Sequence, residues 1–152
     1  MTPQYQDRNQ QSGRQGDQSP AANTTFLADA VKNGIDDAFI KAAEQFAEKH
    51  LNGPHVSKSQ IRNVYGSIMK IQGRLRVASD SEYAKTGWLE DLRMLIPRIS
   101  YAANRSGKIK DYADLVKKAI NVVSGHPEPQ RIKAFERFCK GMEAILAWHN
   151  VK

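Results

Sequence analysis

The chain has 152 residues, 40% of them hydrophobic, and its 23 lysines and arginines outnumber its 16 aspartates and glutamates to give a formal net charge of +7. A chain of this length can bury roughly two thirds of the surface it exposes when unfolded, which is enough for one domain with its own core. No apolar run approaches the roughly 20 residues that span a bilayer, so we expect no membrane-spanning segment. The single cysteine, Cys139, allows no intramolecular disulfide, and we expect a core thiol in a reducing, cytoplasmic protein.

The first 24 residues differ in composition from the rest of the chain. They are rich in Gln, Gly, Ser and Pro and contain almost nothing to bury, which predicts a disordered tail. From residue 25 onwards apolar residues recur with a period near 3.6, and no alternation of period 2 persists. The sequence therefore predicts an all-α fold, a five- to six-helix bundle that forms a single domain over residues 25–152.

Apolar spacing and capping residues predict five helical segments: residues 25–51, 57–77, 81–105, 111–123 and 129–148. We expect the first to be interrupted at Asn33 and Gly34, with Asp36 capping the part that follows. Ser57 or Ser59 is expected to cap the second segment.

The third segment contains one proline and ends at a glycine. Pro97 should kink the helix, because its ring removes a backbone donor and crowds the carbonyl of Arg93. Gly107 is predicted to end the helix as a left-handed cap, with Lys108 and Lys110 placed favourably near the negative end of the helix dipole.

The positive charge is concentrated in one third of the sequence. Residues 57–110 contain 11 lysines and arginines against 4 aspartates and glutamates, a surplus of seven, whereas the remaining residues carry 12 of each sign. One region thus holds the whole imbalance. This favours a surface that binds a polyanion over evenly solvated charged faces.

A charged stripe lies opposite the apolar stripe of the segment 57–77. At 100° per residue it contains Lys58, Arg62, Lys70 and Arg74, with two glycines in its middle. Gly66 and Gly73 are unexpected there, because each should cost about 0.8 to 1 kcal/mol relative to alanine inside a helix. Either they serve close helix packing or a helix break at Gly73, or their missing side chains let a phosphate or ribose approach the backbone.

A second basic face is predicted in the segment 81–105. Arg98, Tyr101 and Arg105 stand at positions i, i+3 and i+7 on one face, which Met94 extends, about 125° from the apolar stripe. A tyrosine ring between two guanidinium groups suits phosphate pairing combined with stacking of a base or ribose. The alternative is that Tyr101 packs on a neighbouring helix and hydrogen-bonds through its hydroxyl group.

The usual signatures of catalysis are missing from the sequence. It has no HExxH, CxxC, GxSxG or glycine-rich phosphate loop, and its four histidines are scattered over predicted helix ends and loops. The adjacent acidic residues, Asp36 with Asp37 and Glu90 with Asp91, could be read as metal ligands. Neighbouring helical positions point 100° apart, however, and acidic residues near a helix N-terminus are explained by the helix dipole. We expect no catalytic residue, no metal and no cofactor.

Three stretches carry a resemblance to a known family: "IRNVYGSIMKI" (61–71), "LRMLIPRISYAANR" (92–105) and "AFERFCKGMEAILAW" (134–148). Over about residues 25–150 the chain resembles the small subunit of type III-A CRISPR effector complexes, the Csm small-subunit family. The resemblance implies several copies stacked head to tail along the inside of the complex, beside the subunits that hold the guide and cut RNA. These copies would line the RNA channel and contact the phosphate backbone without reading sequence.

The resemblance and the charge distribution together define a set of expected RNA contacts. Four residues match the family strings: Arg62, Arg98, Tyr101 and Arg105. Six more are added from the charge distribution alone: Lys58, Lys70, Arg74, Arg76, Lys108 and Lys110.

These observations favour a non-catalytic RNA-binding structural subunit. Its expected partners are single-stranded target RNA, guide RNA, the other Csm subunits and further copies of itself, with no membrane. Two other functions stay open. A helical DNA-binding transcription regulator would place a short recognition helix after a tight turn. A pure protein-interaction bundle would offer its basic face to an acidic partner.

Overall fold

The computed structural model describes residues 22–53, 56–79, 85–105 and 107–149. Within these ranges the chain forms six α-helices and no strand: α2 (Phe26–Asn33), α3 (Asp37–Phe46), α4 (Lys58–Val77), α5 (Trp88–Arg105), α6 (Lys110–Gly125) and α7 (Gln130–His149). A π-helical turn, η1 (Ala47–Leu51), continues α3, and a 3-10 turn, η3 (Gly107–Ile109), leads into α6. The predicted all-α bundle is confirmed.

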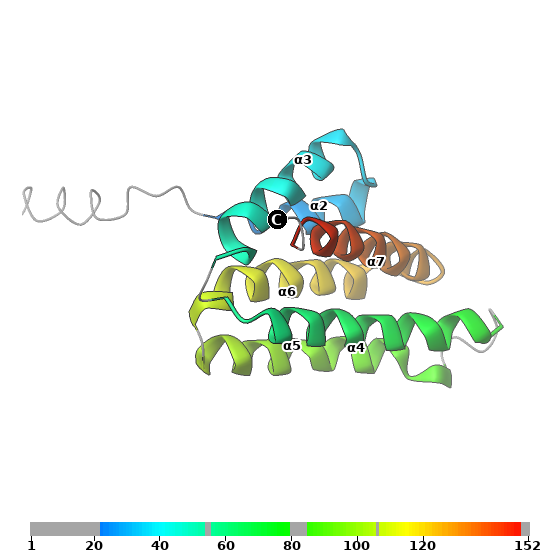
Figure 1. The fold of residues 1–152 in the computed structure, drawn as a ribbon. Helices are drawn as coiled ribbons and strands as arrows, with labels where there is room; N and C mark the ends of the chain where they lie inside the picture. Colours follow the sequence, from blue (N-terminus) through cyan, green and yellow to red (C-terminus); the bar gives the residue numbers. More distant parts are fainter. Residues whose placement is uncertain (1–21, 54–55, 80–84, 106, 150–152) are drawn as a thin grey trace, which may run out of the picture.

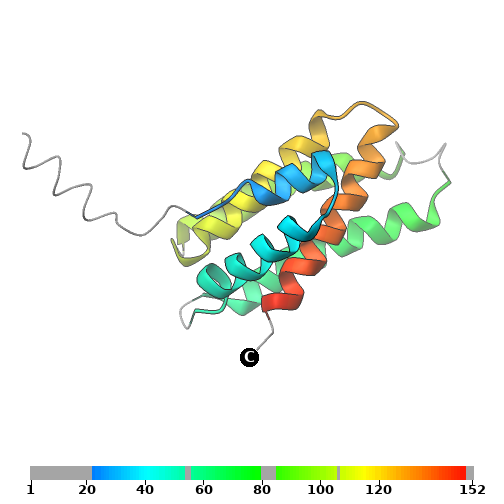
Figure 2. The ribbon, with the colours of Figure 1, turned by 90° about the horizontal axis from the view of Figure 1, so that it is seen from above.

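The helices lie in layers, and α6 runs between them. Helices α4 and α5 form one outer layer and α2 and α3 lie on the opposite side, with α6 and α7 between (Figure 1). Helix α6 packs against α2, α5 and α7, while α4 packs against α5 and α7. Seen from above, α2 lies over α6 and α3 lies beside α7 (Figure 2). The arrangement leaves the outward faces of α4 and α5 to solvent.

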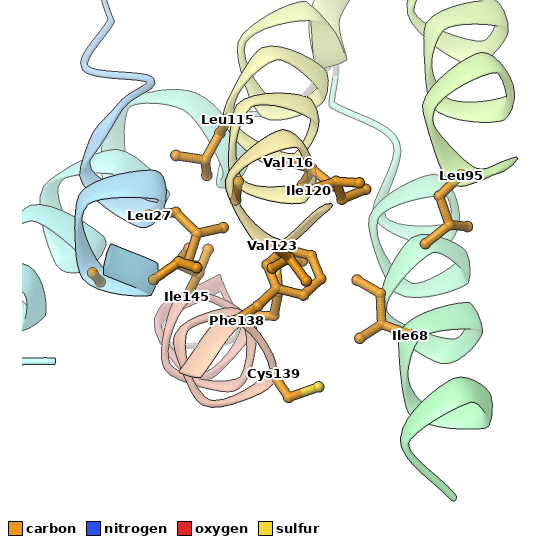
Figure 3. Close-up of a cluster of buried hydrophobic side chains, with 14 of the residues drawn as sticks. Leu27, Ile68, Leu95, Leu115, Val116, Ile120, Val123, Phe138, Cys139 and Ile145 are labelled. Atoms are coloured by element: carbon orange, nitrogen blue, oxygen red, sulfur yellow. The ribbon is translucent and has the colours of Figure 1, made fainter. Parts of the chain in front are cut away.

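Side chains from five helices meet in the core. Leu27 of α2, Ile68 of α4, Leu95 of α5 and Phe138 of α7 converge on the apolar side of α6 (Figure 3). Tyr112 of α6 is also buried, and its hydroxyl group donates a hydrogen bond to the carbonyl of Ile61 at 3.3 Å. Burial raises the pKa of Tyr112 above its usual value, so the hydroxyl keeps its proton. This bond ties the first turn of α4 to α6.

Three predicted caps are present. Gly34 ends α2 with φ of 101°, a conformation that glycine adopts without steric cost. The Asp36 carboxylate begins α3 by accepting a hydrogen bond from the Phe39 N–H at 2.9 Å. At the start of α4 the Ser57 hydroxyl oxygen accepts from the Gln60 N–H at 3.2 Å, so Ser57 rather than Ser59 is the N-cap.

The third predicted segment differs from the structure at both ends. Helix α5 begins at Trp88 rather than near residue 81, and residues 80–84 lie outside the described ranges. The prediction of a left-handed cap at Gly107 is wrong, because Gly107 opens the 3-10 turn η3 and has no positive φ. The chain continues in a helical sense into α6, so no reversal of backbone hand is required.

Helix α5 continues through Pro97 without interruption. Pro97 and Arg93 are both exposed, so water can solvate the Arg93 carbonyl that lacks a donor at position 97. The kink predicted at Pro97 stays a prediction.

The predicted tail, residues 1–24, lies outside the described residues except for its last three. Of these, Thr24 is buried, and its hydroxyl group accepts a hydrogen bond from the Lys118 ammonium group at 2.6 Å. Thr24 therefore belongs to the packed domain.

Cys139 is a core thiol, as predicted. Its side chain is buried on α7 beside the residues that face α6. Burial raises the pKa of Cys139 to about 12. The reactive thiolate form is therefore scarce at neutral pH.

Candidate nucleic-acid interface

Helix α4 buries one stripe and exposes the opposite one. Ile61, Ile68, Ile71 and Leu75 are buried against the bundle. At 100° per residue, Lys70 points away from this stripe and is exposed, and the two glycines of the helix flank it. The orientation predicted for Lys70 is therefore observed.

Gly66 and Gly73 face open space inside a continuous helix. A methyl group added at either position would meet no atom within 4 Å. Close helix packing does not explain these glycines, and α4 continues past Gly73 to Val77, so a helix break does not explain them either. Each still costs about 0.8 to 1 kcal/mol relative to alanine. Neither packing inside the described part of the chain nor a helix break therefore accounts for Gly66 and Gly73.

The predicted row on α5 is exposed to solvent. Tyr101 keeps 65% of its surface accessible, and the Arg105 guanidinium carbon lies 5.9 Å from the centre of its ring. Arg98, one turn before Tyr101, is exposed as well. The alternative that Tyr101 packs on a neighbouring helix is wrong. A cation–π contact at such an exposed site contributes about 0.5 to 1 kcal/mol and fixes the ring beside a positive charge.

Arg98 borders a hollow between α4 and α5. This hollow has a volume of about 260 Å³ and is lined on the α4 side by Gln60, Asn63 and Ser67, and on the α5 side by apolar residues as well as Arg98. These polar residues of α4 were not among the predicted contacts. They stand at i, i+3 and i+7 beside the apolar stripe, a spacing that does identify one flank of a helix.

Arg74 lies at the other end of the α4–α5 layer and is already partnered. Its guanidinium group pairs with the Asp91 carboxylate and also donates to the Thr86 carbonyl at 3.5 Å. Both side chains of the ion pair are about half exposed, so solvent screens it and its contribution to stability is small. An incoming phosphate would compete with Asp91 for Arg74.

The remaining basic residues of α4 lie on a different side of the helix, toward α7. Arg76 lines a hollow of about 310 Å³ together with Glu136, Lys140 and Glu143 of α7. Burial and the negative charge of Glu143 raise the pKa of Tyr65 on the same side of α4. This hollow carries mixed charge, in contrast to the α5 row.

Lys58 and Arg62 lie near the C-terminal end of α7, where their charges act on His149. His149 is 3% exposed, and neither ring nitrogen has a hydrogen-bond partner within the described ranges. Burial lowers the pKa of His149 below its ordinary value, and the positive charges of Arg62 and Lys58 lower it further. The imidazole is therefore neutral at pH 7.

The ten predicted contact residues thus divide into three groups. Lys70, Arg74, Arg98, Tyr101 and Arg105 belong to the α4–α5 layer, and Lys58, Arg62 and Arg76 to the side of α4 that faces α7. Lys108 and Lys110 are exposed at η3 and the start of α6. We call Arg98, Tyr101 and Arg105 the α5 row.

Two further properties of the described residues bear on function. Within the described residues no group of three or more His, Cys, Asp and Glu side chains is placed to hold a metal ion. Across the same residues, every helix is too short or too polar to cross a membrane.

The structure defines an all-α bundle whose outer layer carries an exposed tyrosine between two arginines. A family model described as Csm2 Type III-A matches residues 35–152. The chain belongs to this family, the small subunits of type III-A CRISPR Csm complexes, and the resemblance noted in the sequence is confirmed. Comparisons with curated proteins and with solved structures gave no match.

Replacing Gly66 or Gly73 by alanine should raise the free energy of unfolding by about 0.8 to 1 kcal/mol, because alanine costs less backbone entropy in a helix. Urea denaturation followed by circular dichroism measures the change. Gly141 of α7 is the matched control, because an added methyl group there would collide with Leu27 in the core. Gly141→Ala should destabilise the fold by about 1 to 3 kcal/mol. A loss of stability in Gly66→Ala or Gly73→Ala would contradict the open environment of these positions.

The free energy of unfolding should fall as the pH drops below about 6.5, the pKa of an unperturbed histidine. The reason is that the unfolded chain binds a proton at His149 that the folded chain does not accept until a lower pH. The stabilisation is complete above about pH 6.5 and is lost as the pH falls through the pKa of His149 in the folded protein. Urea denaturation at pH 7.5, 6.5 and 5.5 measures the dependence in the wild type and in His149→Gln. The variant should show a shallower dependence, and identical slopes would contradict a depressed pKa.

Proposed function

We propose that this protein is a non-catalytic RNA-binding subunit of a type III-A Csm complex that contacts the backbone of guide and target RNA through the α4–α5 layer. The observation that supports this most directly is the exposed α5 row, in which Tyr101 is 65% accessible and Arg105 lies over its ring. The exposed ring is free to stack on a base or ribose while a positive charge lies beside it.

The chemistry of the α5 row suits a single-stranded polyanion. Arg98 and Arg105 present planar guanidinium groups that bind phosphate oxygens in pairs, and Tyr101 between them offers a face for a base or ribose. Contacts of this kind position the strand and carry no sequence information, which leaves specificity to pairing between guide and target.

The two open glycines of α4 fit the same role. Lys70 stands between Gly66 and Gly73 along the helix, so a phosphate bound by Lys70 meets no side chain at these two positions. The two glycines weaken α4 at this point. Close access of an RNA strand to the helix is a reason for the protein to keep them.

We also infer that copies of the chain stack through ends of opposite charge. Asp29 and Asp36 line a hollow between α2 and α3, in the layer opposite α4 and α5. Asp37 adds an exposed carboxylate at the start of α3. The same layer also exposes Lys32, Lys41 and Lys49, so the acidic end consists of this hollow and the start of α3. An acidic end and a basic end on one molecule favour head-to-tail contacts over contacts between like ends.

Single-stranded RNA binding should weaken with salt, with a slope of log affinity against log salt near −3 if one copy neutralises about four phosphates. The double variant Arg98→Ala/Arg105→Ala should bind every RNA sequence more weakly and reduce the slope to about −1.4. The matched control is Lys41→Ala/Lys49→Ala, which removes two exposed charges from α3 and η1. Fluorescence anisotropy over a salt series provides the measurement.

The same titration separates the competing functions. A flat salt response, or equal effects of the two double variants, would contradict phosphate contacts by the α5 row. Tight binding to duplex DNA with none to single-stranded RNA would favour the DNA-binding regulator instead.

Sedimentation velocity tests the stacking proposal. The sedimentation coefficient of the wild type should rise with protein concentration at low salt, and Asp29→Asn/Asp37→Asn should reduce that rise, because two carboxylates leave the acidic end. A wild type that stays monomeric at every concentration and salt would contradict self-association through these ends.

A further inference from the structure

We propose that the hollow between α4 and α5 binds one unpaired nucleobase of the RNA strand. The proposal rests on the RNA-binding function above and goes beyond it, because it assigns a pocket for a base next to a surface for phosphates.

The size of the hollow fits a small planar ligand. Its volume is about 260 Å³. A cavity of about 150 Å³ is enough to admit benzene, whereas drug-sized ligands occupy about 300 to 1,000 Å³. The hollow thus lies between these two sizes, which is the range of a single base.

The lining combines an apolar surface with a polar edge. Leu95, Ile99 and Ala102 of α5 supply apolar surface for the faces of a ring. Gln60, Asn63 and Ser67 stand along the α4 side, and all three carry groups that form hydrogen bonds. This distribution, apolar faces with polar groups along one edge, matches the chemistry of a nucleobase.

One polar atom of the lining lacks a partner. The side-chain oxygen of Gln60 is shielded from solvent and accepts no hydrogen bond within the described part of the chain. A buried acceptor without a donor is unfavourable. This oxygen is also shielded from the hollow, so a ligand N–H group can satisfy it only when the Gln60 amide turns toward the hollow. Each of the four RNA bases carries at least one N–H donor, so this acceptor alone does not select a particular base.

The surroundings of the hollow supply the rest of a nucleotide site. Arg98 lines the hollow and also belongs to the α5 row, with Tyr101 one turn further along the helix. A base that turns away from the strand into the hollow keeps its own phosphate within reach of Arg98. The next base along the strand then meets the exposed face of Tyr101.

Filling the hollow tests the proposal without changing any charge. Ala102→Leu adds a bulky apolar group inside it, and Ser67→Leu fills it independently from α4. Asn104→Leu is the matched control, because position 104 is exposed on the outward side of α5. Circular dichroism and a thermal melt verify that each variant is folded.

The probes are a single-stranded RNA and a ribose-phosphate strand of equal length that lacks bases. The wild type and Asn104→Leu should bind the RNA about fivefold or more tightly than the baseless strand. The hollow and Tyr101 both contribute to this ratio of affinities. Ala102→Leu and Ser67→Leu should lower this ratio and leave affinity for the baseless strand unchanged. The side-chain amide signals of Gln60 and Asn63 should shift in NMR spectra when AMP or UMP is added to the wild type, and not in Ala102→Leu.

The outcomes distinguish the two proposals. An unchanged ratio in both filling variants, with unshifted amide signals, would overturn base binding in the hollow and leave RNA binding by the α5 row intact. If the wild type binds neither strand at low salt, the RNA-binding function itself fails, and the base pocket fails with it.

Discussion

The complete burial of the apolar side of α6 is the constraint on which the rest of the structure depends. Leu115, Val116, Ala119, Ile120 and Val123 have no accessible surface. One neighbouring helix cannot cover so broad an apolar surface, so α2, α5 and α7 all pack against α6. At about 25 cal/mol for each Å² of apolar surface removed from water, this burial is the main source of stability.

The burial of α6 also determines which surfaces remain available for function. Helix α5 directs Leu92, Leu95 and Ile99 to the bundle and has no second apolar stripe. The α5 row lies about 120° away around the helix, where no other helix covers it. Exposure of Arg98 and Arg105 costs little, because water screens the repulsion between them. The core sets the orientation of α5, and the orientation sets the exposure of Tyr101.

The fold could be predicted from sequence because its signals are local. Periodicity near 3.6 located the helices, and Gly34, Asp36 and Ser57 act through contacts within a few residues of themselves. Gly107 was predicted wrongly because a glycine after an apolar stripe is only a local signal, whereas in the structure Gly107 opens a 3-10 turn whose last residue, Ile109, is buried. The start of α5 at Trp88 was missed by several residues for a related reason, since acidic and polar residues before it have helical spacing without apolar surface to bury.

The candidate site was predictable only as far as a single helix determines it. The spacing i, i+3 and i+7 placed the residues of the α5 row on one face. Whether Tyr101 is exposed or packs on a neighbouring helix was left open by the sequence and is decided by the structure. The grouping of residues across helices was not predictable. Arg74 finds Asp91 seventeen positions away, and Gln60 meets the α5 side of the hollow only because α4 and α5 pack side by side. Such pairings depend on the tertiary arrangement, which no local pattern encodes.

The two sides of α4 differ in a way that suits a subunit with two kinds of partner. Toward α5 the acidic residues are confined to the first turn of that helix, and the arginines of the α5 row follow without an acid among them. Toward α7, Arg76 and Lys140 share a hollow with Glu136 and Glu143, so charges of both signs meet there. A uniformly negative RNA strand is repelled by those carboxylates, whereas a protein surface can present groups of both signs to match them. If the protein binds RNA as proposed, this difference in charge favours the α5 side for the strand and the mixed-charge hollow beside α7 for a protein neighbour.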